Sequence, residues 1–212
     1  MFTELQARVV RLFFGLSESV GFVLAGGGAL VVRHEVDRST NDVDFFVDDQ
    51  QAVGQAANAL EAALLGEGFE VERVRDYPTY VRFEVQGDGS QVEVDLGYDF
   101  RWRPAEISEY GPVLSSEELA VDKLLCLFGR AEARDFVDAF FLARRHGIEQ
   151  ILRWAPEKDE GFSRYYLAVN LERFDRRPRT EFDVDDETFT EMTNFFADLR
   201  ARLMREVLDS RS

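Results

Sequence analysis

The sequence predicts an α+β protein in which helices flank a mixed sheet and a C-terminal helical domain follows. Up to residue 96, short runs rich in Val, Phe and Tyr are bounded by Gly, Asp and Pro, as expected for strands. From residue 117 onward, apolar residues recur with helical spacing, and glycines or capping residues separate the segments. We therefore expect an α/β domain over 1–112 and a helical domain over 113–212.

The composition indicates a globular protein without a membrane span. The chain has 212 residues, of which 45% are hydrophobic, so it is long enough to form a sizeable core. It contains no apolar run long enough to cross a bilayer, and its first residues do not have the pattern of a secretory signal. Its one cysteine, Cys126, lies in an apolar helical pattern and is expected to be a buried thiol. We expect a cytoplasmic protein with no membrane partner.

The segment Phe22–Asp48 is expected to form the centre of the sheet. Its predicted elements are a strand over 22–25, a turn of Gly26, Gly27 and Gly28, a helix over 29–35 and a strand over 43–47. Side chains alternate between the two faces of a strand, so Asp42 and Asp44 should point to the same face. Val43 and Phe45 should then point into the core.

Together, the glycines and the two aspartates suit a metal–nucleotide complex. Glycines let the backbone approach phosphate oxygens closely, and the N–H groups at a helix start favour anions. Paired carboxylates are the hard oxygen ligands that Mg²⁺ prefers. Taken alone, each feature has a simpler explanation: the glycines as a turn, and the aspartates as a solvated strand edge or a cap.

The remaining segments complete the predicted sheet and its helices. The expected helices are 2–19, 51–65, 117–128, 131–145, 149–154, 161–174 and 187–208, and the further strands are 69–74, 80–86 and 91–96, with an irregular segment over 98–112. The sequence Gly87-Asp88-Gly89 predicts a hairpin between the last two strands. In the strand over 91–96, Glu93 and Asp95 share a face, which indicates either an exposed sheet edge or the floor of an active site.

Two motifs in this order resemble a known family. Gly26-Gly27-Gly28-Ala29-Leu30, followed by Arg38-Ser39-Thr40-Asn41-Asp42-Val43-Asp44, resembles the signature of the AbiEii/AbiGii nucleotidyltransferase family. Lys123, Arg130, Arg134, Asp135 and Asp138 resemble its second signature, and the likeness spans residues 20 to 150. These proteins are similar to toxins of type IV toxin–antitoxin and abortive-infection systems, on the DNA polymerase beta type of nucleotidyltransferase fold.

The resemblance implies a nucleotidyltransferase that uses Mg²⁺ or Mn²⁺ and an NTP. It assigns the metal to Asp42, Asp44 and Asp95, the last also as a base, with Glu93 as a substitute. The implied nucleotide contacts are Gly26, Gly27, Gly28, Arg38, Ser39, Arg130 and Asp138, with Lys123 and Asp135 as further catalytic residues, in a cleft between the domains. Where family members usually carry a hydroxyl residue, this chain has Gly28, and Ser39 or Thr40 is the expected replacement.

The resemblance also implies partners, which the charge of the chain qualifies. The acceptor would be RNA, at the 3′ end of tRNA, and a separate antitoxin protein would counter the toxin. The net charge of −16 is unusual for a protein that binds nucleic acid, so RNA would need a local basic patch, for which the segment 174–179 is the best candidate. The alternatives are a nucleotidyltransferase that modifies a cationic small molecule of the aminoglycoside type, or a non-catalytic nucleotide-binding module.

Overall fold

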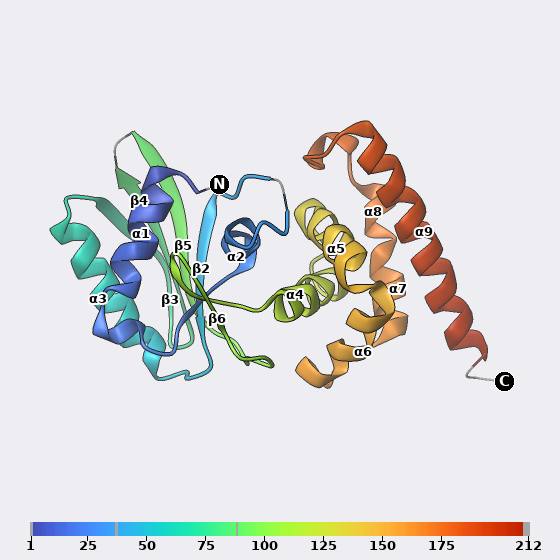
Figure 1. Cartoon of the computed structure of the whole chain (residues 1–212), viewed down its shortest axis with the longest axis horizontal. Helices are drawn as coiled ribbons and strands as arrows, with labels where there is room; N and C mark the ends of the chain where they lie inside the picture. The colour runs from blue at the N-terminus through green and yellow to red at the C-terminus, as the bar shows by residue number, and fades with distance from the viewer. Residues whose placement is uncertain (1, 37, 88, 210–212) are drawn as a thin grey trace. The chain divides into compact units, whose positions relative to one another are not determined.

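The computed structural model describes residues 2–36, 38–87 and 89–209 (Figure 1). These residues group into two compact units, Met1–Leu119 and Ala120–Ser212. The sequence placed the division at 112/113; the first unit extends further because Leu114 N donates to Leu24 O at 3.0 Å. Glu118 also belongs to this unit, since its carboxylate accepts from the backbone N–H of Trp102 and of Arg103 at 3.0 and 2.6 Å.

The described strands of the first unit form one mixed sheet, as predicted, and it has seven strands where the sequence predicted five. Its order is β3-β4-β5-β2-β1-β7-β6. The strands are β1 (Val23–Ala25), β2 (Asp42–Val47), β3 (Glu70–Tyr77), β4 (Tyr80–Gly87), β5 (Ser90–Tyr98), β6 (Glu106–Ser108) and β7 (Gly111–Val113). β2 pairs in parallel with β5, and β1 in parallel with β7, while the other pairs are antiparallel.

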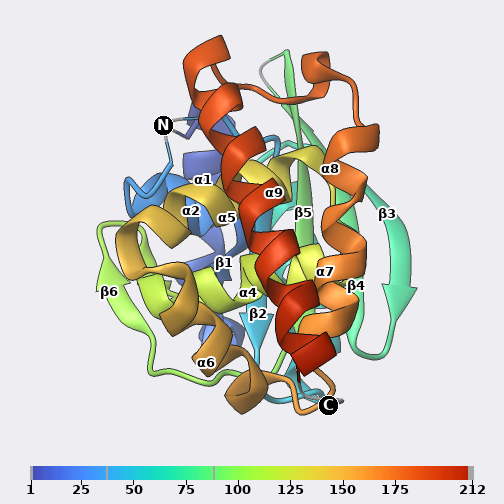
Figure 2. The ribbon, with the colours of Figure 1, turned by 90° about the vertical axis from the view of Figure 1, so that its right-hand side faces the viewer.

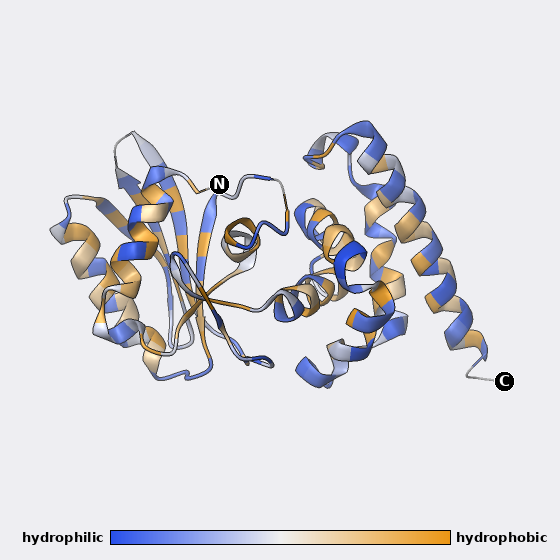
Figure 3. Ribbon diagram, in the orientation of Figure 1, coloured by the Kyte–Doolittle hydropathy of each residue, from blue (hydrophilic) through white to orange (hydrophobic). Residues whose placement is uncertain are grey.

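Two helices cover one face of this sheet, and the core lies between them and the strands. The helix α1 (Glu4–Phe14) contacts β2 and β5, and the helix α3 (Ala52–Gly66) contacts β3, β4 and β5 (Figure 1). Both helices carry hydrophobic and hydrophilic residues, as their half-buried positions require (Figure 3). Phe45 of β2 is fully buried, and its ring lies 4.1 Å from that of Phe13, centroid to centroid. The opposite face of β2 and β5 therefore carries the acidic side chains.

The hairpin between β4 and β5 fixes which side chains are neighbours on that face. Gly87 pairs with Ser90, and the same register places Arg82 opposite Asp95. The hairpin is confirmed, with Gly89 at φ +75°. Asp88, the central residue of the predicted turn, lies outside the described residues.

Three predicted elements of the first unit need correction. Gly26, Gly27 and Gly28 do not form a separate turn but open the helix α2 (Gly26–Val32), which begins directly after β1. The segment predicted to be irregular, 98–112, contains β6 and most of β7. These strands form because β7 pairs with the edge of β1, with Val113 opposite Leu24, and so extends the sheet. The helix predicted over 2–19 ends at Phe14, where Gly15 caps it, and a short 3-10 turn, η1 (Ser17–Ser19), follows.

The second unit is helical, as predicted. Its helices are α4 (Ser116–Phe128, which begins in the first unit), α5 (Ala133–His146), α6 (Ile148–Lys158), α7 (Arg164–Leu171), α8 (Arg173–Arg176) and α9 (Asp186–Asp209), with the 3-10 turn η2 (Arg179–Glu181). The single helix expected over 161–174 is thus split into α7 and α8. α7 and α9 lie side by side (Figure 2). Among the described residues, every helix is too short or too polar to cross a membrane.

Candidate functional site

Asp42 and Asp44 lie on the face of β2 that points away from the core, as predicted. Val43 and Phe45 between and after them are fully buried, whereas both aspartates are partly exposed. Ala25, the last residue of β1, is the register partner of Asp44. The strand therefore presents two carboxylates beside the point where β1 runs into α2.

The glycines at the start of α2 make room for these carboxylates. Gly26 has φ +57°, and a Cβ atom at this position would lie 1.9 Å from Asp44 Oδ2. A Cβ atom at Gly27 would lie 2.7 Å from Thr40 Oγ1 and 3.4 Å from Asp42 Oδ1. Gly26 therefore needs glycine because the Asp44 carboxylate lies against its backbone, and Gly27 because the Thr40 hydroxyl does. Gly28 differs, since the ring of Phe2 occupies the space beside it, 3.2 Å from where its Cβ would be.

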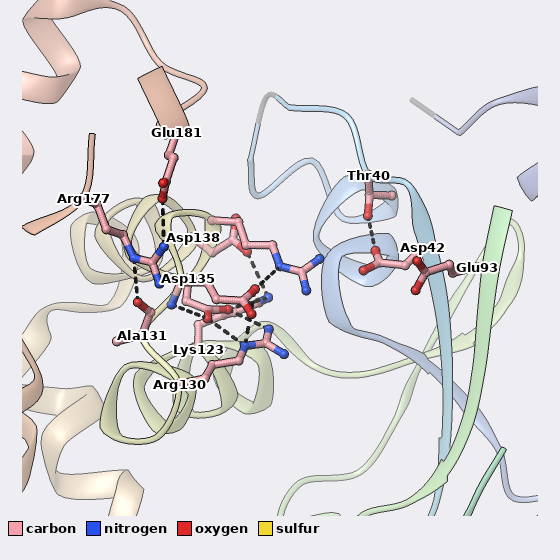
Figure 4. Close-up of polar contacts among 12 residues, drawn as sticks. Thr40, Asp42, Glu93, Lys123, Arg130, Ala131, Asp135, Asp138, Arg177 and Glu181 are labelled. Carbon is pink, nitrogen blue, oxygen red and sulfur yellow. Dashed lines mark hydrogen bonds and ion pairs between the residues drawn. The ribbon is translucent and has the colours of Figure 1, made fainter. Parts of the chain in front are cut away.

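The loop before β2 is fixed by polar contacts. The hydroxyl of Thr40 donates to Asp42 Oδ1 (Figure 4), and Gln6 of α1 donates to the Thr40 carbonyl at 2.7 Å. Arg38 donates to the carbonyl of Ser39 at 2.8 Å, and the Ser39 side chain is exposed. Arg38 lies beside Gly27, since its Nη2 would be 3.3 Å from a Cβ atom there, and Ser39 lies on the same loop, which ends at Asp42.

Asp95 lies next to Asp44 in the register of β5 and β2, but its carboxylate contacts β4. Both of its oxygens accept from Arg82, at 2.7 Å from Nε and 2.6 Å from Nη2. The residue is 5% exposed. Burial, followed by the charge of Asp95, raises the pKa of Tyr80 to about 12. Glu93, directly opposite Asp42 (Figure 4), forms an ion pair with Arg82 Nη1 at 2.8 Å.

The residues around the glycines fit a magnesium ion. In the described ranges no three Asp, Glu, His or Cys side chains lie close enough together to form a metal site. Mg²⁺ is, however, commonly held by one or two carboxylates together with substrate phosphates, rather than by a complete set of protein ligands. Asp42 and Asp44 can supply such a pair, because both stand on the same face of β2, beside the point where β1 runs into α2.

The residues of the second motif form a buried ionic network in the second unit (Figure 4). Lys123 Nζ lies 3.0 Å from Asp138 Oδ2 and 3.8 Å from Asp135 Oδ1. Asp135 accepts two hydrogen bonds from Arg130, both at 2.9 Å, and one from the Glu132 N–H at 3.1 Å. Asp135 and Asp138 are fully buried and Lys123 is 5% exposed, whereas the Arg130 side chain is 47% exposed.

The pKa values of this network reflect the competition between burial and pairing. Burial lowers the pKa of Lys123, but the charges of Asp138 and Asp135 outweigh it and hold the pKa above its ordinary value. Burial raises the pKa of Asp135, but the bonds from Arg130 and the charge of Lys123 hold it below its ordinary value. Lys123 and Asp135 are therefore charged at neutral pH. Cys126, which is mostly buried, has its pKa raised to about 11 by burial, as expected for an inert thiol.

Two arginines hold the loop that carries Arg130. Arg177 belongs to the segment 174–179, which was predicted to face RNA, and Arg173 directly precedes that segment. Arg173 donates to the carbonyls of Gly129 and Arg130 at 3.2 and 2.8 Å, and Arg177 donates to that of Ala131 at 3.0 Å. Arg177 also pairs with Glu181 at 2.8 Å (Figure 4). These carbonyls lie in the loop between α4, which ends at Phe128, and α5, which begins at Ala133. Arg177 therefore has a structural role in the second unit.

The sequence did not reveal the role of Thr40 or the presence of Arg82 beside the site. Thr40 was considered only as a replacement phosphate contact, although its hydroxyl orients Asp42. Arg82 was not considered at all. The hairpin register alone could have identified it, because pairing Gly87 with Ser90 necessarily places Arg82 opposite Asp95.

Comparison with known proteins identifies the family. Residues 12–209 match the family described as the nucleotidyl transferase AbiEii toxin of type IV toxin–antitoxin systems. The chain is 21% identical over 201 residues to the uncharacterized protein aq_aa25 of Aquifex aeolicus, with 89% of each chain covered. Because the match extends over almost the whole chain, the protein belongs to the AbiEii nucleotidyltransferase toxin family.

Solved structures show the same fold at low identity. MenT4, a nucleotidyltransferase toxin of Mycobacterium tuberculosis, has a TM-score of 0.57 at 20% identity, covering 96% of this chain and 89% of its own. JHP933 of Helicobacter pylori has a TM-score of 0.53 at 17% identity, covering 100% and 98%. The predicted nucleotidyltransferase fold is therefore confirmed.

The close approach at Gly26 predicts a large loss of stability in Gly26→Ala. The new side chain would occupy a left-handed conformation and overlap the Asp44 carboxylate, so the free energy of unfolding should fall by at least about 2 kcal/mol. Gly54→Ala is the matched control: it lies inside α3 with nothing within 4 Å, and should stabilise by about 0.5–1 kcal/mol. Denaturant unfolding compares the two. Equal effects would contradict the close approach.

The buried network predicts a pH-dependent contribution from Asp135. Asp135→Asn removes the buried carboxylate that accepts two hydrogen bonds from Arg130 and leaves Lys123 with Asp138, so it should destabilise the second unit by about 3–5 kcal/mol at neutral pH. Because the folded pKa of Asp135 lies below its ordinary value of 3.8, the difference from wild type should be complete above pH 3.8 and shrink as the pH falls through the folded value.

Denaturant unfolding at a series of pH values measures this difference. Asp183→Asn, at an exposed position of the same unit, should change the stability by less than about 0.5 kcal/mol. A difference between wild type and Asp135→Asn that grows toward low pH would show that the ionised carboxylate does not stabilise the network.

Proposed function

We propose that this toxin-family nucleotidyltransferase transfers a nucleotidyl group from an NTP to a hydroxyl acceptor and that it requires Mg²⁺ or Mn²⁺. The observation that carries the proposal is the close approach of Asp44 to Gly26, with Asp42 on the same face of β2, which places two hard oxygen donors beside glycine backbone of the kind that can approach phosphates. A bound divalent ion would neutralise charge on the phosphates and on the leaving group. In such transfers, positioning and charge neutralisation supply most of the rate.

We propose a role for each residue of the site from its contacts and its exposure to solvent. Asp42 and Asp44 hold the ion, Thr40 orients Asp42, and the backbone of Gly26–Gly28 together with Arg38 and Ser39 contacts the phosphates. Asp95 has both oxygens on Arg82, so we leave it out of the proposed ligand set.

In the second unit, the exposed guanidinium of Arg130 is the group that would meet a phosphate. Lys123, Asp135 and Asp138 are buried, so we propose that they act through Arg130 by fixing its side chain. Arg130 keeps its positive charge in this setting because Asp135 raises its pKa.

The proposed acceptor is RNA, at the 3′ end of tRNA, and the proposed setting is the cytoplasm, with a separate antitoxin protein as the partner that restrains the toxin. Membership of a type IV toxin–antitoxin family supports this role. The exposed arginines of the second unit, among them Arg130, Arg134 and Arg176, are the groups available to phosphates.

A second candidate is a cationic small-molecule acceptor of the aminoglycoside type. It is favoured by a row of acids that crosses four neighbouring strands on the face that carries Asp42. The row runs through register partners Glu72↔Glu84, Glu84↔Glu93 and Glu93↔Asp42. Like charges directly opposite one another destabilise a sheet, and a cationic ligand would relieve that repulsion.

Purified protein incubated with Mg²⁺, each labelled NTP and either total RNA or a set of aminoglycosides should label one acceptor class, and chelation of the metal should abolish labelling. Asp44→Ala should lower the rate by about 10²–10³-fold or more, because it removes one of the two proposed ligands. Asp48→Ala, an exposed aspartate beyond the end of the same strand, is the control and should leave the rate unchanged. Labelling that survives Asp44→Ala would place the site elsewhere.

A further inference from the structure

One guanidinium holds both acids of β5. Arg82 of β4 donates from Nε and Nη2 to the two oxygens of Asp95, and its Nη1 pairs with Glu93 at 2.8 Å. The register partners of these two acids on the next strand are Asp44 and Asp42. The residues that the sequence grouped as one acidic set therefore form two pairs, one on β2 and one on β5, and Arg82 contacts the β5 pair.

The strand order determines which way Asp95 faces. Because β5 lies between β4 and β2, Arg82 and Asp44 are on opposite sides of Asp95. The carboxylate is turned toward β4, with both oxygens in short charge-assisted bonds to the planar guanidinium fork. Such bidentate pairs are strong, and separating a buried pair leaves an uncompensated charge. Asp95 therefore has its counterion within the fold.

We infer that Arg82 is a positioning residue that serves as the fixed counterion of Asp95 and Glu93 and so confines a divalent cation to Asp42 and Asp44. This inference rests on the proposed function, since it concerns the metal of that site. It makes Asp95 a structural partner of Arg82 and not a metal ligand. Without Arg82, two carboxylates next to Asp44 and Asp42 would lack a counterion, and a divalent cation would take that place.

Binding of Mn²⁺ alone to the full chain, measured by electron paramagnetic resonance, tests the inference without any activity assay. Asp95→Asn should keep the dissociation constant within about threefold of wild type, and it should match Glu93→Gln, which removes the same charge two residues away on β5. If Asp95→Asn instead weakens binding by about tenfold or more while Glu93→Gln does not, Asp95 is a ligand and the inference is overturned.

The reverse effect is expected when Arg82 is removed. Arg82→Gln should tighten Mn²⁺ binding by about tenfold, and adding Asp95→Asn should return the affinity toward wild type. Arg75→Gln, at the register partner of Arg82 on β3, removes the same charge from the same face and should change the affinity by no more than about twofold. A residue with only a structural role would lower the melting temperature on substitution and leave Mn²⁺ affinity unchanged or weaker.

Asp44→Asn separates this inference from the proposed function. It should abolish Mn²⁺ binding, because it removes one of the two ligands. If wild type binds no Mn²⁺, or if Asp44→Asn binds it unchanged, the metal site and the metal-dependent function fail together. If Asp44→Asn loses binding and Arg82→Gln does not gain it, only the role of Arg82 is overturned. Should Arg82→Gln fail to fold, the comparison of Asp95→Asn with Glu93→Gln still decides the question.

Discussion

The close approach of the Asp44 carboxylate to the backbone of Gly26 is the contact on which the rest of the site depends. No side chain fits between them, since a Cβ atom at Gly26 would lie 1.9 Å from Asp44 Oδ2. The antiparallel pairing of β1 with β2 brings the two residues together, because Ala25 is the register partner of Asp44. The buried side of the same strand, with Phe45 against Phe13, then fixes the face on which Asp42 and Asp44 stand.

Charge compensation organises the acidic residues of this chain at two levels. On the sheet, Arg82 neutralises the β5 acids and leaves the β2 acids beside the glycines. In the helical unit, Lys123 and Arg130 share Asp135, and burial strengthens these pairings because a lone buried charge is costly. Although the net charge of the chain is −16, a few cationic side chains, Arg82, Lys123 and Arg130, pair with the buried acids of these two places.

Much of the fold and part of the site could be predicted from local sequence. Alternation along 42–47 was sufficient to place Asp42 and Asp44 on one face, and the hairpin and the helical second half were identified from turn residues and periodicity. The pairing of Asp95 with Arg82 was not predicted, because it depends on register across two strands. The strands β6 and β7 were missed because three-residue strands carry too little periodicity, and they form by pairing with β1. The burial of Lys123 likewise depends on how α4 and α5 pack, which spacing alone does not determine.

The most direct test of the central claim is a crystal structure with Mn²⁺ and a non-hydrolysable NTP analogue, in which anomalous scattering locates the ion. The account predicts an anomalous peak within bonding distance of Asp42 and Asp44, with the analogue's phosphates against the Gly26–Gly28 backbone and Arg82 still on Asp95. An ion bound elsewhere, or phosphates placed away from the glycines while the ion is absent from these two aspartates, would contradict it.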